Sequence, residues 1–272
     1  MTTTTILSIM AVLGYLGVGI RLFDNVRLKE NIQNSKHHFT TQFLLLIVLL
    51  IHFFTVLDSV ASHQGLNLSL PMAFSLIFWI SFFIYWVFGF FYELSILYLL
   101  IVLAGFLISP IYFLLTPPPV SLTQPINPYQ LHPLFSIAAY GIFTVAGLQS
   151  LIMLLAQRFL NSGKIPRYFL SLPPLLTMEK ILFKMIFIGV GLLSMALVTG
   201  MFFLQDTTGK ILQFNYKIIF ALLSWVIFFA LCAGRVFFGW RGRVALNWTL
   251  VGCIFLILAY IGTRFVIEVL LR

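Results

Sequence analysis

Long apolar runs separated by short polar connections dominate the chain. A helix that crosses a bilayer needs about 20 mostly apolar residues at a rise of 1.5 Å each. The third and fourth runs are separated by little more than Glu93. The pattern predicts an all-α, polytopic helical membrane bundle of about eight transmembrane helices. The expected spans are residues 6–23, 39–61, 71–92, 94–116, 132–159, 181–204, 217–238 and 244–270.

Positively charged residues are distributed unevenly among the connections between these runs. The connections after runs one, five and seven are rich in Lys and Arg, those after runs two and four contain none, and that after run six holds Lys210 and Lys217. Basic connections stay in the cytoplasm. This distribution predicts that both the N and C termini lie outside. We interpret the first run as a retained span, because no basic residue precedes it and no small-residue cleavage site follows it.

The connection between residues 116 and 131 is rich in proline. Such a sequence is stiff and extended, so we expect a spacer or lid on the outer side. None of the connections is long enough for a separate soluble domain. The sequence therefore predicts a single integral membrane domain over residues 1–272. The prolines in question are Pro117, Pro118, Pro119, Pro125 and Pro128.

Composition agrees with this pattern and excludes two classes of protein. Hydrophobic residues make up 61% of the chain and charged residues only 8%, whereas a soluble domain carries about 25% charged residues. The net charge of +9 does not indicate a nucleic-acid partner, because the basic residues lie between apolar runs and form no groove-binding stripe. Cys232 and Cys253 lie inside apolar runs without a CxxC motif, which indicates small buried residues instead of redox chemistry.

Histidines on the predicted outer side are the first candidates for chemistry. His52 lies about 20 Å from the cytoplasmic boundary of its run, in the outer half of a core about 30 Å thick. A polar residue at that depth is a functional candidate by default. His52 either bonds to a neighbouring helix or binds a ligand. His132 opens the fifth run, with Tyr140 eight residues later, and His63 lies in the outer connection after the second run.

Imidazole is the usual axial ligand of haem iron. An apolar outer pocket rich in Phe and Trp would suit a haem, with His52 and His132 as tentative iron ligands. His132 could instead be an interfacial polar residue beside Pro133. Arg264 could pair with Glu268 along the last helix or meet a carboxylate such as a haem propionate.

Catalytic motifs are not found in the sequence. Carboxylates are few and scattered, and neither an HExxH motif nor a Cys/His cluster occurs. We expect a protein that is not an enzyme. Arg235, near the cytoplasmic end of the seventh run, is expected to extend to the lipid headgroups.

Three stretches together resemble a known family. They are His132 followed by Tyr140, Gln149 and Gln157; LPPLLTMEK with the later Thr199-Gly200-Met201-Phe202; and Leu223-Ser224-Trp225, GWRGR and the segment ending at Arg264. Their order and spacing are similar to the cytochrome c assembly family of membrane proteins, of the CcsA and HemX type. The resemblance runs from about residue 41 to the end and is strongest after His132.

The resemblance implies a bacterial inner-membrane, multi-pass protein that moves or presents haem on the outer face for attachment to apocytochrome c. It places His132 at a family outer histidine. His52 or His63 falls in the region of a family membrane histidine. Together with Tyr140 and Arg264, these histidines make up the predicted cofactor-binding set, and cytochrome c maturation proteins are the partners that the resemblance implies.

Departures from the family pattern limit what the resemblance implies. The stretch QDTTGKILQFNYK contains no tryptophan where a tryptophan-rich segment is expected, Gly262-Thr263-Arg264 replaces a second outer histidine, and Arg235 replaces a histidine before GWRGR. We therefore expect haem binding or handling, with degenerate haem-delivery activity. The alternative is a haem-free accessory subunit of a transport system such as a cation exporter. His52 lies about 9 Å below Asp58, which is near the outer end of the same run. For both histidines to reach one iron, His132 must lie closer to the membrane centre, or the haem plane must be perpendicular to the membrane.

Overall fold

The structure is a computed structural model that describes residues 3–28, 35–62, 70–91, 95–114, 131–163, 166, 169, 172–208 and 216–259. Within these ranges the chain is entirely helical, with eight α-helices and no strand. The all-α prediction is therefore confirmed. The helices are α1 (Thr3–Leu28), α2 (Ser35–Ser62), α3 (Leu70–Phe88), α4 (Ser95–Leu114), α5 (Leu131–Ser162), α6 (Leu175–Thr208), α7 (Tyr216–Phe238) and α8 (Arg243–Ile257).

Each predicted apolar run corresponds to one helix of the structure. Helices α1, α2, α5, α6 and α7 are long and apolar enough to cross a membrane, and Met72–Phe88 and Arg243–Ile257 are shorter apolar helices. Helix α4 carries no charged residue over its 20 residues. Hydrophobic side chains remain exposed on these helices, for example Leu13 and Ile188, as lipid-facing surfaces require. The chain is a multi-pass membrane protein, and the predicted orientation of its termini stays a prediction.

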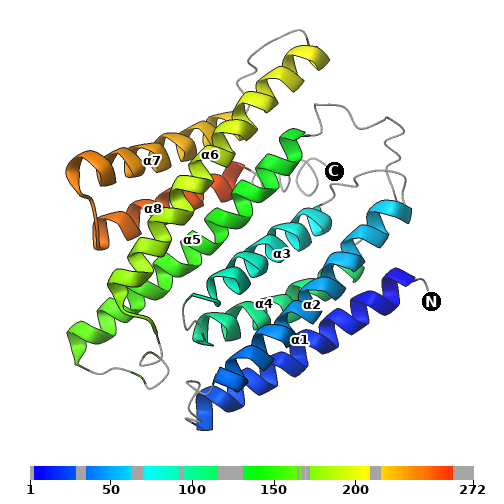
Figure 1. Cartoon of the computed structure of the whole chain (residues 1–272). Helices are drawn as coiled ribbons and strands as arrows, with labels where there is room; N and C mark the ends of the chain where they lie inside the picture. The colour runs from blue at the N-terminus through cyan, green and yellow to red at the C-terminus, as the bar shows by residue number, and fades with distance from the viewer. Residues whose placement is uncertain are drawn as a thin grey trace. The chain divides into compact units, whose positions relative to one another are not determined.

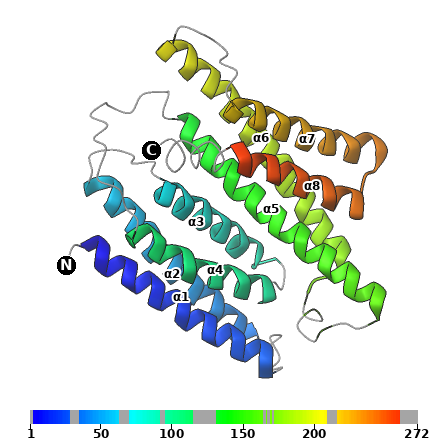
Figure 2. The same ribbon diagram turned by 180° about the vertical axis from the view of Figure 1, so that it is seen from behind.

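The chain divides into two compact units. Unit 1 is Met1–Pro125 with Ile165–Pro173, and unit 2 is Ile126–Lys164 with Pro174–Arg272. In unit 1, α1 and α3 each pack against both α2 and α4; in unit 2, α5 and α7 each pack against both α6 and α8. Figures 1 and 2 show α1–α4 in blue to green and α5–α8 in green to red. Each unit is thus a closed ring of four helices, and the single domain expected over residues 1–272 stays a prediction.

The core of unit 1 is built around Tyr15, which is completely buried. Its ring packs edge-on to Phe78 and tilted against Phe82, both from α3. A Cβ at Gly105 of α4 would come within 2.9 Å of both Tyr15 and Phe78. The glycine therefore allows α4 to approach this aromatic group closely. The indole N–H of Trp79 donates to the backbone carbonyl of Leu49 at 2.9 Å, which fastens α3 to α2.

The core of unit 2 contains a layer of two aromatic rings and two glycines, with one residue from each of its four helices. Phe143 of α5 and Phe228 of α7 are stacked, with ring centroids 3.8 Å apart. A Cβ at Gly189 of α6 would lie 2.8 Å from the Phe143 ring, and a Cβ at Gly252 of α8 would lie 2.8 Å from the Phe228 ring. We call these four residues the aromatic layer. It fixes the spacing of all four helices, because protein interiors are close-packed.

Candidate functional site: two histidines and one ion pair

His52 lies in the middle of α2 and is 2% exposed. Its Nδ1 is 2.8 Å from the hydroxyl oxygen of Tyr15 on α1, and its Nε2 is 2.8 Å from the hydroxyl oxygen of Ser75 on α3. A neutral imidazole has one donor and one acceptor nitrogen, and a hydroxyl can serve as either. Both ring nitrogens are therefore engaged. One of these bonds would have to break before His52 could bind a metal.

His132 is the second residue of α5 and lies in unit 2. Pro133 follows it, and proline is tolerated in the first helical turn because the N–H groups there have no partner inside the helix. The Nδ1 of His132 donates to the backbone carbonyl of Ala196 on α6 at 2.7 Å. A carbonyl can only accept, so Nδ1 carries the proton. In a neutral ring this leaves a lone pair on Nε2.

The Nε2 atom of His132 has no hydrogen-bond partner among the described residues. Lys217, the second residue of α7, is exposed and acts electrostatically on His132. A single imidazole with one engaged and one available nitrogen is the arrangement found at metal-ligating histidines. His132 therefore has the chemistry of a ligand in this structure.

The other predicted site residues lie elsewhere. His63 and Arg264 fall outside the described residues. Tyr140 lies on α5 and lines a cavity of about 370 Å³ between α5 and α8, together with Phe143 and Cys253. His52 lies in unit 1 and His132 in unit 2. That the two histidines share one iron stays a prediction. Within the described ranges, no group of three or more His, Cys, Asp or Glu residues could hold a metal ion.

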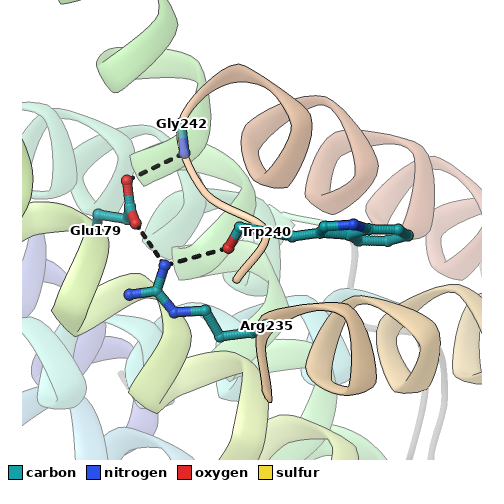
Figure 3. Close-up of polar contacts among 4 residues, drawn as sticks. All are labelled: Glu179, Arg235, Trp240 and Gly242. Carbon is teal, nitrogen blue, oxygen red and sulfur yellow. Dashed lines mark hydrogen bonds and ion pairs between the residues drawn. The ribbon is translucent and has the colours of Figure 1, made fainter. Parts of the chain in front are cut away.

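An ion pair lies where the α7–α8 turn meets the start of α6 (Figure 3). A guanidinium nitrogen of Arg235 donates to Glu179 Oε1 at 2.9 Å and to the backbone carbonyl of Trp240 at 3.1 Å. The other carboxylate oxygen, Oε2, accepts from the backbone N–H of Gly242 at 3.1 Å. The Arg235 guanidinium also lies 4.4 Å from the centre of the Phe183 ring, within range of a cation–π contact. We call this group the Glu179 clamp.

The turn inside the clamp depends on three glycines. Gly239 and Gly242 have φ angles of 64° and 63°, a conformation that glycine adopts without the steric cost of a Cβ. A Cβ at Gly234 would overlap the indole of Trp240, so this ring folds back onto α7. The GWRGR sequence therefore builds a tight turn that presents the Gly242 N–H to Glu179. Carboxylates are favoured at such helix N-termini.

The Glu179 clamp was not predicted from the sequence, which led us to expect Arg235 at the lipid headgroups. Its guanidinium instead bonds to Glu179, whose side chain is only 10% exposed. The sequence signal was present: Glu179 is a carboxylate at the start of a long apolar helix, and such a group requires a partner. Tyr15 and Ser75, the partners of His52, were not predicted either, because a single hydroxyl in an apolar run does not reveal which helix it faces.

Comparison with known proteins places these residues in a family. The profile of the family described as “Cytochrome C assembly protein” matches residues 38–271. An “uncharacterized 28.8 kDa protein in nifR3-like 5′ region” of Azospirillum brasilense is 32% identical over 141 residues, 52% of each chain. Inner membrane protein YpjD of Escherichia coli strain K12 is 29% identical over 131 residues, 48% of this chain and 49% of YpjD.

A third relative carries a functional name. The cytochrome c biogenesis protein CcsA of Gloeobacter violaceus is 24% identical over 92 residues, 34% of this chain and 27% of CcsA. The alignments therefore span about half the length of the first two relatives and less of the third. The family profile covers most of the chain, including α2 to α8 and both histidines. The chain belongs to the cytochrome c assembly protein family.

Proposed function

We propose that this protein binds haem through His132 and acts as a haem-handling factor of the bacterial inner membrane, not as an enzyme. The observation that carries the proposal is the hydrogen bond from His132 Nδ1 to the Ala196 carbonyl. A histidine whose Nδ1–H is held by a carbonyl presents Nε2 in a fixed orientation and with raised basicity. Histidine is a common axial ligand of haem iron, and this donor fits that role.

Lys217 supports the same assignment. It lies at the start of α7, is exposed, and acts electrostatically on His132. A haem carries anionic propionates, and lysine is a compact, mobile cation that binds such groups. Lys217 would therefore pair with a propionate, and His132 would supply a nitrogen ligand to the iron.

His52 has a structural role in this proposal. Its two nitrogens join α1, α2 and α3 through the hydroxyls of Tyr15 and Ser75. Haem held by a single protein ligand dissociates more readily than haem held by two, which suits a factor that binds haem in order to pass it on. Cytochrome c maturation proteins are the proposed partners, in keeping with the similarity to the cytochrome c biogenesis protein CcsA.

Absorption spectroscopy of purified protein tests the proposal. We would express the wild type, His132→Ala and the control His38→Ala with ample haem and purify each in mild detergent. The wild type and His38→Ala should show a Soret band, whereas His132→Ala should lose it. Free imidazole should restore the band in His132→Gly, because it supplies the missing ligand. A colourless wild type would reject haem binding and favour a haem-free accessory subunit of a transport system.

A further inference from the structure

Gly200 of α6 lies against the ring of His132. A Cβ built at Gly200 would be 2.9 Å from Cε1 and 3.0 Å from Nδ1 of the imidazole. We propose that Gly200 is a positioning residue that allows His132 to bond to the Ala196 carbonyl and so sets which nitrogen of His132 is available to a ligand. This inference rests on the proposed function where it concerns haem, but its effect on the imidazole can be measured without haem.

Access to the Ala196 carbonyl is the first step of the argument. In an α-helix the carbonyl of residue i accepts from the N–H of residue i+4, so the Ala196 carbonyl points toward Gly200. A carbonyl oxygen has a second lone pair. The His132 Nδ1–H uses it at 2.7 Å, while the Thr199 hydroxyl, which donates to the Met195 carbonyl at 2.7 Å, lies 3.2 Å from the same Ala196 oxygen. The ring reaches this position from the side, over the place where any other residue at position 200 would carry its Cβ.

The atoms that a Cβ would meet are the second step. They are Nδ1, which makes the bond to Ala196, and Cε1, which joins the two ring nitrogens. Separations of 3.0 Å or less are shorter than ordinary contact between non-bonded heavy atoms. A methyl group at position 200 would therefore push the ring away from the Ala196 carbonyl. Helix α6 has little room to yield instead, because Gly189 on the same helix is packed against Phe143.

Removal of this bond has a defined chemical consequence. Without an acceptor on Nδ1, the imidazole is no longer restricted to the tautomer with the proton on Nδ1. The lone pair then moves between the two nitrogens, and the ring loses its fixed orientation. For metal-ligating histidines, loss of such an outer hydrogen bond lowers metal affinity about 10–100-fold.

The same helix provides a matched control. Gly191 lies nine residues before Gly200 on α6 and is exposed, and a Cβ there would meet nothing within 4 Å. Alanine is a better helix former than glycine, so both Gly191→Ala and Gly200→Ala favour the helical state of α6. A difference between the two variants therefore reports on the contact with His132.

The test without haem is nitrogen NMR of protein labelled with [15N]histidine, which contains only five histidines. The wild type and Gly191→Ala should show His132 as the Nδ1–H tautomer, assigned by its loss in His132→Ala. Gly200→Ala should show His132 as a mixture of tautomers. An unchanged His132 tautomer in Gly200→Ala, or the same change in Gly191→Ala, would overturn the inference.

The test with haem measures affinity and midpoint potential in the same variants. Gly200→Ala should bind haem about 10–100-fold more weakly and show a higher midpoint potential, because a less basic imidazole stabilises ferric iron less. Gly191→Ala should match the wild type in both quantities. A wild type that binds no haem would reject the proposed function, while the NMR result still decides the role of Gly200. Haem binding with equal affinity and potential in all three proteins would reject the role of Gly200 alone.

Discussion

His52 and His132 are two imidazoles inside apolar helices, and their surroundings give them opposite properties. In unit 1, two hydroxyls engage both nitrogens of His52. In unit 2, one backbone carbonyl engages only Nδ1 of His132. Hydroxyls adapt to either nitrogen and complete the bonding of the ring, whereas a carbonyl imposes one tautomer. The comparison indicates that the bonding partners of a histidine decide whether one of its ring nitrogens keeps an available lone pair.

Chemical modification should separate the two histidines most strongly. Diethyl pyrocarbonate adds to an imidazole nitrogen with a free lone pair, so His132 should be modified at Nε2 while His52 remains unmodified in the folded protein. Mass spectrometry of peptides from briefly treated protein would measure both sites. Modification of His52 at a rate equal to that of His132 would remove the distinction between them.

Replacement of each histidine by leucine should show which one stabilises the fold. His52→Leu leaves the hydroxyls of Tyr15 and Ser75 without their partner, and we expect the free energy of unfolding to fall by about 2–4 kcal/mol. His132→Leu removes a single bond to a carbonyl that also belongs to a helix, and we expect a loss below about 1 kcal/mol. Unfolding in mixed micelles would measure both, and equal losses would contradict the comparison.

The Glu179 clamp, and not a histidine, should be the polar group that stabilises unit 2. Glu179→Gln leaves Arg235 without its charged partner at a partly buried position, and we expect a loss of about 2 kcal/mol. Arg235→Lys keeps the charge but loses the planar guanidinium, so its loss should be smaller. Thermal unfolding of both variants beside the wild type would measure the order, and a larger loss in Arg235→Lys would contradict it.

A single hydroxyl beside His52 should contribute less to stability than the whole imidazole. Tyr15→Phe removes one of the two bonds, and we expect a loss of about 1 kcal/mol. Thr55→Val is the matched control on α2, because the Thr55 hydroxyl donates to the carbonyl of Ile51 four residues earlier in its own helix. The same unfolding assay should show little change in Thr55→Val. Similar losses in the two variants would mean that the bond between helices contributes nothing.

The helices could be predicted from the sequence because their signal is local. Each apolar run is long enough to identify a helix without knowledge of its neighbours, and the eight runs correspond to eight helices. The structure starts α6 at Leu175, earlier than the expected residue 181. The sequence pattern missed the first turns of this helix because the charge of Glu179 interrupts the apolar run. The part of the expected last span beyond residue 259 lies outside the described residues.

The partners of the polar side chains could not be predicted, because they depend on helix packing. His52 bonds to residues 37 and 23 positions away, and Arg235 bonds to a residue 56 positions away. No periodicity within one run reveals which helices are neighbours. The interpretation of His52 as a histidine bonded to neighbouring helices agrees with its surroundings, and its role as an iron ligand stays a prediction. The family resemblance, which depends on ordered motifs, is confirmed.

The aromatic layer of unit 2 has a consequence for how this sequence can evolve. Gly189, Phe143, Phe228 and Gly252 are in close contact across four helices, so a larger residue at either glycine leaves no space for the ring beside it. Mutational drift at these sites should therefore be epistatic. Alanine at position 252 becomes acceptable after Phe228 has shortened to leucine, and a lineage that takes the two steps in the opposite order passes through a defective intermediate.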